Sequence, residues 1–95
     1  MVPDEAIFER NATFADSPVG EAAVILNTDE LLYFAVNRVG ARIWRLLESP
    51  RTLGELVQIL SQEFAVEPSI CRQETSAFLY QLLDRKLAVR QGGDR

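Results

Sequence analysis

The chain has 95 residues, of which 47% are hydrophobic and 25% charged, with a formal net charge of −4 at pH 7. This composition predicts one globular domain over residues 1–95, ordered from about residue 6 to residue 90, and its acidic balance opposes binding to a phosphate backbone. The sequence has no apolar run near the roughly 18 residues of a membrane span and no signal-peptide pattern at its N-terminus. We therefore expect a cytoplasmic protein without membrane or nucleic-acid partners.

The side-chain inventory limits the possible chemistry. The chain has one cysteine, Cys71, and no histidine. One thiol cannot form an internal disulfide or a thiolate metal cage, and without histidine there is no Ser–His or Cys–His pair and no imidazole ligand. No glycine-rich phosphate loop is present. The sequence thus predicts a non-enzymatic domain that holds no metal or cofactor.

The first third of the chain has the composition of β-strands. Residues 6–10 form a candidate short strand, and residues 11–20 are rich in Asn, Asp, Ser, Pro and Gly, which is typical of a loop. Residues 22–26 and 31–36 are apolar runs separated by the turn-forming residues 27–30. These two runs predict an antiparallel hairpin.

The remainder has helical periodicity. Asn37 is a candidate N-cap for a helix to about residue 48, and Thr52 with Glu55 forms a capping-box pattern that opens a second helix. Pro68 suits the first turn of a third helix, and residues 87–89 can form a final strand. The predicted fold is α+β, a winged helix-turn-helix with a three-stranded antiparallel N-terminal sheet packed on three helices.

Two surfaces are candidates for binding. The strand 31–36 is apolar throughout, so it is either buried on both sides or an edge to which an extended peptide adds as a further strand. The third helix carries Glu74 and Arg85 on one flank of its apolar stripe and Arg72 and Ser76 on the other. A solvated flank is the default interpretation unless a partner docks there.

A third feature is a row of arginines on the first helix. Arg38, Arg42 and Arg45 share one face, which favours a solvent-facing charged stripe over a docking face for an acidic partner. Three arginines are a thin basis for DNA binding. If the third helix entered the major groove of DNA, it would present Arg72 and Gln73 to the bases, but also acidic residues.

Five short segments follow one another in a specific order. Residues 7–10, 33–37, 40–47 and 52–56 are similar to V-F-R, Y-Y-A-L-N, G-A-R-I-W-E-L-L and T-V-E-E-L, and Glu74, Phe78, Leu79 and Leu82 are similar to D-x-x-x-F-L-x-x-L. Together they resemble the PqqD-like family, the recognition elements for ribosomally made and post-translationally modified peptides. The resemblance runs from about residue 7 to residue 89. Two departures are the missing glycines near Leu31 and Lys86, and a third is Glu in place of Asp at residue 74.

The resemblance implies that the leader segment of a precursor peptide adds as a strand to the third strand and packs against the third helix. It implies a partner that is a modifying enzyme or a cysteine-type leader peptidase, as in lasso-peptide clusters or beside radical-SAM enzymes. A winged-helix DNA-binding regulator and an adaptor that recruits an enzyme without touching leader are the alternatives. The expected peptide-binding residues are Leu31, Leu32, Tyr33, Phe34, Ala35, Arg72, Glu74, Thr75, Phe78, Leu79 and Leu82.

Overall fold

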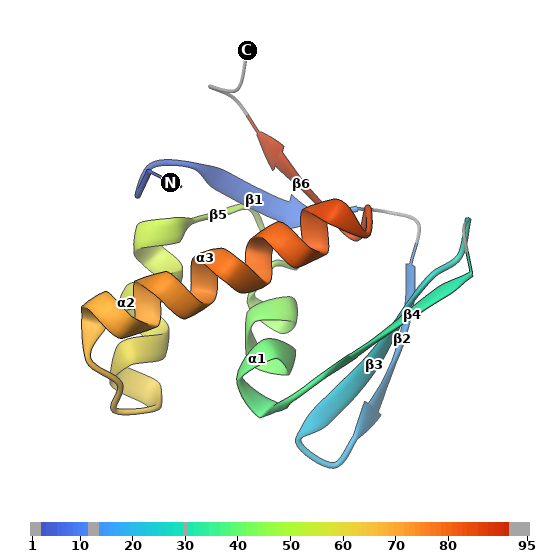
Figure 1. The fold of residues 1–95 in the computed structure, drawn as a ribbon, viewed down its shortest axis with the longest axis horizontal. Coiled ribbons are helices and arrows are strands. Elements are labelled where there is room, and N and C mark those ends of the chain that lie inside the picture. The colour runs from blue at the N-terminus through green and yellow to red at the C-terminus, as the bar shows by residue number, and fades with distance from the viewer. Residues whose placement is uncertain (1–2, 12–13, 30, 92–95) are drawn as a thin grey trace.

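The computed structural model describes residues 3–11, 14–29 and 31–91, without the side chain of Leu32. Six strands and three helices are formed by these residues (Figure 1). In chain order they are β1 (Ile7–Arg10), β2 (Phe14–Val19), β3 (Ala22–Asn27), β4 (Leu32–Val36), α1 (Arg38–Leu46), β5 (Arg51–Thr52), α2 (Leu53–Glu63), α3 (Pro68–Asp84) and β6 (Ala88–Gln91). The predicted α+β class with three helices and a three-stranded antiparallel sheet is confirmed.

The larger sheet has the order β2-β3-β4, and both of its pairings are antiparallel. The prediction of a loop over residues 11–20 was wrong for residues 14–19, because β2 pairs with β3 from Phe14 to Val19, and residues 12–13 lie outside the described part of the chain. Its polar residues and Pro18 are tolerated since β2 is an edge strand, where an imino acid removes no ladder hydrogen bond. Gly20, with a φ of 64°, and Glu21 turn the chain into β3.

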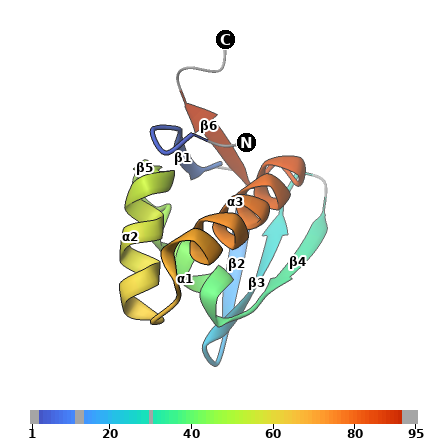
Figure 2. The same cartoon turned by 60° about the vertical axis from the view of Figure 1, so that its left-hand side comes forward.

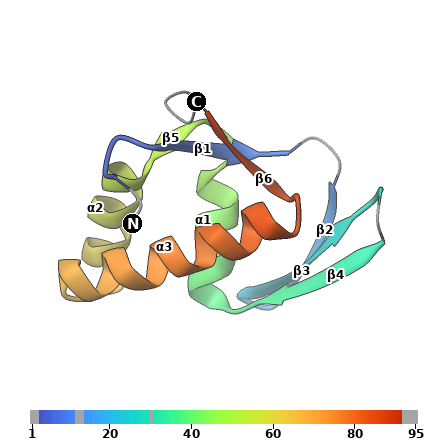
Figure 3. The same cartoon turned by 45° about the horizontal axis from the view of Figure 1, so that its top comes forward.

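The first strand belongs to a second sheet, of order β5-β1-β6. In β1, Ile7 to Arg10 lie opposite Gln91 to Ala88 of β6, so the two ends of the described chain are paired (Figure 3). The three-stranded N-terminal sheet therefore contains β2 in place of the predicted strand 6–10. The strand β1 pairs instead with β6, some 80 residues away in the chain, and no local pattern in the N-terminal segment specifies that partner.

The helix starts are those that the sequence predicts. The side chain of Asn37 accepts a hydrogen bond from the Gly40 backbone N–H at 2.9 Å, and Thr52 and Glu55 form a reciprocal capping box. Glu67 caps α3. Hydrogen bonds from the Ser69 hydroxyl and then from the Ile70 backbone N–H lower the pKa of the Glu67 carboxyl. Each helix thus begins with its orphan backbone donors partly satisfied.

Helices α2 and α3 end in the same way, with a non-glycine residue in the left-handed region. Ala65 has a φ of 54° and Lys86 a φ of 60°. The next backbone N–H groups donate back to the Ser61 and Leu82 carbonyls, as in a Schellman motif. Lys86 therefore holds a backbone conformation that glycine adopts more readily, near the position where the resemblance implies a glycine.

The helices lie on one side of β2-β3-β4 (Figure 2). The hydrophobic core contains side chains from both sheets and from all three helices. Its largest fully buried side chains include Phe8, Ile25, Leu47, Leu56 and Leu82. A hydrogen bond connects β2 to α1: the Trp44 indole N–H donates to the Asp16 carboxylate at 2.6 Å. None of the helices in the described part of the chain is long and apolar enough to cross a bilayer.

The Arg10 side chain locks β1 against α1. Its Nε donates to the Trp44 carbonyl at 2.9 Å, and its guanidinium lies over the rings of Phe14 and Trp44. Desolvation by burial lowers the pKa of Arg10, and the nearby Asp16 carboxylate opposes that shift. The arginine of the V-F-R-like segment is thus a structural residue that fixes how the two sheets meet.

Candidate functional site

Strand β4 lies at one edge of the larger sheet. Its neighbour on one side is β3, and among the described residues no strand pairs with its other side. Phe34 and Val36 face the helices, whereas Tyr33 is 74% exposed and Ala35 is exposed on the opposite face. Of the two interpretations for this apolar strand, burial on both sides is excluded by the structure. We call the unpaired side of Leu32–Val36 the β4 edge.

An aromatic contact links β4 to α3 along this edge. The rings of Phe34 and Phe78 stack with centroids 5.7 Å apart and planes 27° apart. The Arg85 guanidinium lies 4.3 Å from the centroid of the Phe34 ring. Because Phe34 and Phe78 are only partly buried, this contact leaves apolar surface beside the β4 edge.

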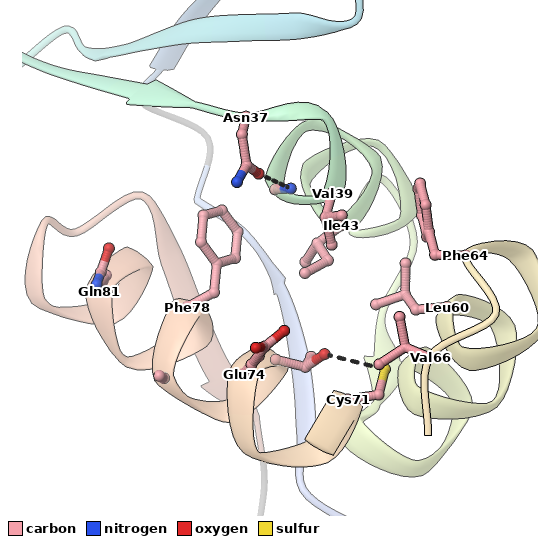
Figure 4. Close-up of a pocket in the computed structure, with 13 residues that line it drawn as sticks. Asn37, Val39, Ile43, Leu60, Phe64, Val66, Cys71, Glu74, Phe78 and Gln81 are labelled. Carbon is pink, nitrogen blue, oxygen red and sulfur yellow. Dashed lines mark hydrogen bonds between the residues drawn. The ribbon is translucent and has the colours of Figure 1, made fainter. Parts of the chain in front are cut away.

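A hollow of about 420 Å³ opens next to this contact, between α1, the end of α2 and α3 (Figure 4). Apolar side chains make most of its wall, including Ile43, Leu60, Phe64 and Val66. Among the described residues that line it, Glu74 alone carries a charge. The hollow therefore combines an apolar interior with one carboxylate, an arrangement that suits a side chain with an apolar body and a polar or cationic tip.

Gly40 lets the walls of the hollow come close together. A Cβ atom at this position would lie 3.0 Å from the Phe78 ring and 3.1 Å from the Cβ atom of Val36. These distances are shorter than ordinary van der Waals contact, so the α1 backbone approaches both β4 and α3 through the absence of a side chain. This explains the glycine at the start of the segment 40–47.

The predicted site residues divide into groups. Tyr33, Phe34 and Ala35 lie in β4, and Leu31 is 70% exposed in the turn before it, with a φ of 57° near the position where the resemblance implies a glycine. The side chain of Leu32 lies outside the described part of the chain. On α3, Glu74, Thr75 and Phe78 line the hollow, although only 2% of the Thr75 surface is exposed.

Three predicted residues lie elsewhere. Leu79 and Leu82 are 0% exposed, so in this structure they are core residues without surface for a peptide. Arg72 makes a two-bond ion pair with Asp4, at 3.0 and 3.1 Å, and is directed to the N-terminal segment. The flank of α3 that faces the hollow is the one with Glu74. Sequence periodicity places Leu79 and Leu82 on one stripe, between the flanks of Arg72 and Glu74, but it does not show which part of the helix other elements cover.

Several lining residues were not predicted. Asn37, Val39, Gly40, Ala77 and Gln81 line the hollow and connect it to the end of β4. The only sequence signal for them was the N-cap pattern at Asn37, since an N-cap directly after a strand places the start of a helix beside the strand end. The other positions depend on how α1 and α3 pack.

Two arginines of the row on α1, Arg38 and Arg42, make contacts within the domain. Arg38 pairs with Glu21 at 3.2 Å and lies over the Phe64 ring, and Arg42 pairs with Glu63 at 3.0 Å. Such exposed ion pairs contribute little to stability. They do neutralise positive charge that would be needed to bind an acidic partner or a phosphate. The solvent-facing interpretation of the row fits these contacts.

The hollow shows no arrangement for acid–base catalysis or metal binding in the residues that the structure describes. Arg10 and Glu67, whose pKa values are lowered, do not line it. The Cys71 thiol is part of its wall, but it is nearly buried and lies 3.8 Å from the Thr75 hydroxyl. No cluster of three or more Asp, Glu, Cys or His residues occurs in the described ranges. What the geometry offers is a surface for binding.

Comparisons with known proteins agree with the observed fold. The family model for coenzyme PQQ synthesis protein D (PqqD) matches residues 22–88. A solved structure of TbiB1 in complex with the TbiA(beta) leader peptide is similar with a TM-score of 0.78 and 24% identity, covering 92% of this chain and 99% of that one.

A second similar structure is a lasso peptide synthetase B1 complexed with its leader peptide. Its TM-score is 0.75 at 20% identity, and the alignment covers 86% of this chain and 96% of that one. A search of curated protein sequences found no match. The family match spans more than half of the sequence, and it includes β3, β4, all three helices and the hollow between them. The chain belongs to the PqqD family.

Proposed function

We propose that this domain captures the leader segment of a ribosomally made precursor peptide, which adds to the β4 edge as an antiparallel strand beside α3. The observation that carries the proposal is the unpaired, apolar β4 edge next to a hollow with one carboxylate. Strand addition satisfies the open main-chain groups of β4 and places alternate peptide side chains on each face of the sheet. The two similar structures are complexes with leader peptides, which supports this choice of ligand.

The side chains of the bound strand would have two environments. Those that face the helices meet Phe34, Phe78 and the hollow, and those on the opposite face lie beside Tyr33 and Ala35. Burial of one large apolar side chain contributes about 1.5–3 kcal/mol, and ordering a flexible peptide opposes binding. We expect a dissociation constant between roughly micromolar and nanomolar.

The domain would act by presentation and without catalysis of its own. In this role it holds the leader while a modifying enzyme or a cysteine-type leader peptidase acts on the same precursor, in lasso-peptide or related biosynthesis. The nearly buried thiol and the single carboxylate at the hollow support a binding role over a chemical one.

Fluorescence polarisation with a labelled leader, taken from the precursor encoded beside this gene, tests the proposal. A scrambled leader is the control. A scan with N-methylated leader peptides tests the geometry, because an added strand donates main-chain hydrogen bonds from every second residue only. We expect tenfold or greater losses at alternate positions, where each lost hydrogen bond and the added methyl clash act together. Absence of saturable binding up to high micromolar concentrations refutes capture, and a helical period of losses refutes strand addition.

A further inference from the structure

The two edges of the β2-β3-β4 sheet are built differently. Strand β2 carries Asp16, a charged residue, and Pro18, which has no main-chain donor. Both are devices that keep an edge from pairing with another chain. Strand β4, Leu-Tyr-Phe-Ala-Val, has no charge, proline or glycine. The unprotected edge is therefore the one on which a further strand can be placed.

The sheet face beyond the helices is also uncharged. The pairing of the strands places Ala15, Leu26 and Tyr33 in one row, and Ser17, Val24 and Ala35 in the next. In a chain with 25% charged residues, six adjacent positions without charge form a distinct surface. Helix α1 packs on the opposite face, and α3 contacts it through Phe34, so this face stays open (Figure 2).

We infer that, when no peptide is bound, the β4 edge pairs with the β4 edge of a second copy of this chain. An antiparallel pair about a two-fold axis at Phe34 places Tyr33 opposite Ala35 of the second copy, and Leu32 opposite Val36. Every cross-strand pair is then uncharged. Although each copy has a net charge of −4, no like charges face each other within the strand pair. The result is one six-stranded sheet with no apolar edge at its centre.

The pairing is weak enough to be displaced. A stable interface buries about 1,200 Å² or more, and a strand pair with five residues on each side buries less than that. We therefore expect a dissociation constant of roughly 10–500 µM for the dimer. A leader strand takes the same main-chain groups and in addition fills the hollow beside Phe78. Leader and second copy therefore compete for one edge, a consequence that rests on the proposed function only for the identity of the competitor.

Sedimentation equilibrium of the full chain, from low micromolar to near-millimolar concentration, tests the pairing. The weight-average mass should rise toward twice the monomer mass, and saturating leader peptide should return it to that of a 1:1 complex. A mass that stays monomeric throughout overturns self-pairing. A complex of two chains with two bound leaders overturns competition. If leader does not bind at all while the chain still dimerises, the proposed function fails and the self-pairing stands.

Charge variants test the register. Tyr33→Lys with Ala35→Lys places like charges opposite each other twice across the axis, and should abolish the dimer. Tyr33→Lys with Ala35→Glu places opposite charges there, and should restore or strengthen it. Both positions are exposed, and circular dichroism checks that each variant is folded.

The matched control is Ala15→Lys with Ser17→Lys, which puts the same charges on the same face at the protected edge. This control should leave the mass curve unchanged. Equal loss of dimer in the control overturns edge pairing in favour of face-to-face contact. Equal behaviour of the two β4 variants overturns the register about Phe34.

Discussion

Glu74 provides the sharpest separation of binding from folding. Its side chain is exposed on α3 at the hollow, and within the described ranges it makes no hydrogen bond or ion pair. Glu74→Ala therefore leaves no orphaned partner inside the domain. The free energy of unfolding should change by less than about 0.5 kcal/mol, as for other exposed helix positions.

The expected effect on leader binding follows from the position of the carboxylate. Glu74 is the one charged side chain among the described residues lining an otherwise mostly apolar hollow, so a hydroxyl or cationic group of the leader at that point would pair with it. A charge-assisted hydrogen bond of this kind is worth about 1–3 kcal/mol. The dissociation constant should rise by roughly 5-fold to 150-fold.

The assay combines fluorescence polarisation with a thermal melt on the same variant. Asp84→Ala is the matched control, because it removes the same charge from the same helix at a residue that does not line the hollow. Glu74→Gln keeps the side-chain length and one acceptor oxygen. A weakened Gln variant assigns the effect to the charge, and a normal one assigns it to hydrogen-bond acceptance.

Two results would refute the reasoning. Binding within twofold of the parent chain would remove Glu74 from the contact surface. A fall in the melting temperature by more than about 4 °C, which corresponds to about 1 kcal/mol, would mean that the carboxylate stabilises the fold. In that second case the folded fraction of the variant would bind leader normally.

Three further predictions concern the scaffold. Asp16→Ala should lower stability by about 1–3 kcal/mol, since it orphans the buried Trp44 N–H, and a chemical denaturation series should show a smaller loss when Trp44→Phe is already present. Ala65→Gly should raise stability by about 0.5–1 kcal/mol because of the positive φ, whereas Ala77→Gly within α3 should lower it by a similar amount; equal signs would contradict the strain argument. Hydrogen bonds from the serine hydroxyl and the backbone at the start of α3 lower the Glu67 pKa in the folded state, so its stabilisation is present above the usual value of 4.5 and is lost as pH falls through the lower folded value. Glu67→Ala should therefore melt earlier than the parent at about pH 7 and together with it at about pH 2, and a difference that persists in acid would contradict this assignment.

The elements that rest on local interactions could be predicted from the sequence. The caps at Asn37 and Thr52 act within three residues of chain, and the hairpin of β3 and β4 joins neighbouring apolar runs. Strand β2 was missed because its Asp-Ser-Pro composition is typical of a loop, and it is a strand only because β3 offers a full-length partner. Pairing with a neighbour overrode the local preference.

The candidate site was predictable in the same uneven way. The sequence left the strand 31–36 either buried on both sides or an edge for an added peptide, and the structure decided for the edge, with Tyr33, Phe34 and Ala35 on it. The third-helix stripe did not show that Leu79 and Leu82 are covered while Phe78 is half open.

Only the tertiary structure decided these points. Burial on α3 depends on where α1, α2 and the sheet lie against it. Contacts with distant segments also decide that the Glu74 flank faces the hollow, whereas Arg72 on the other flank pairs with Asp4. The strand β1 joined β6 for the same reason. A sequence encodes which side chains are apolar and which backbone groups are capped, but the exposed part of each face is set by long-range packing, whose partners are distant along the chain.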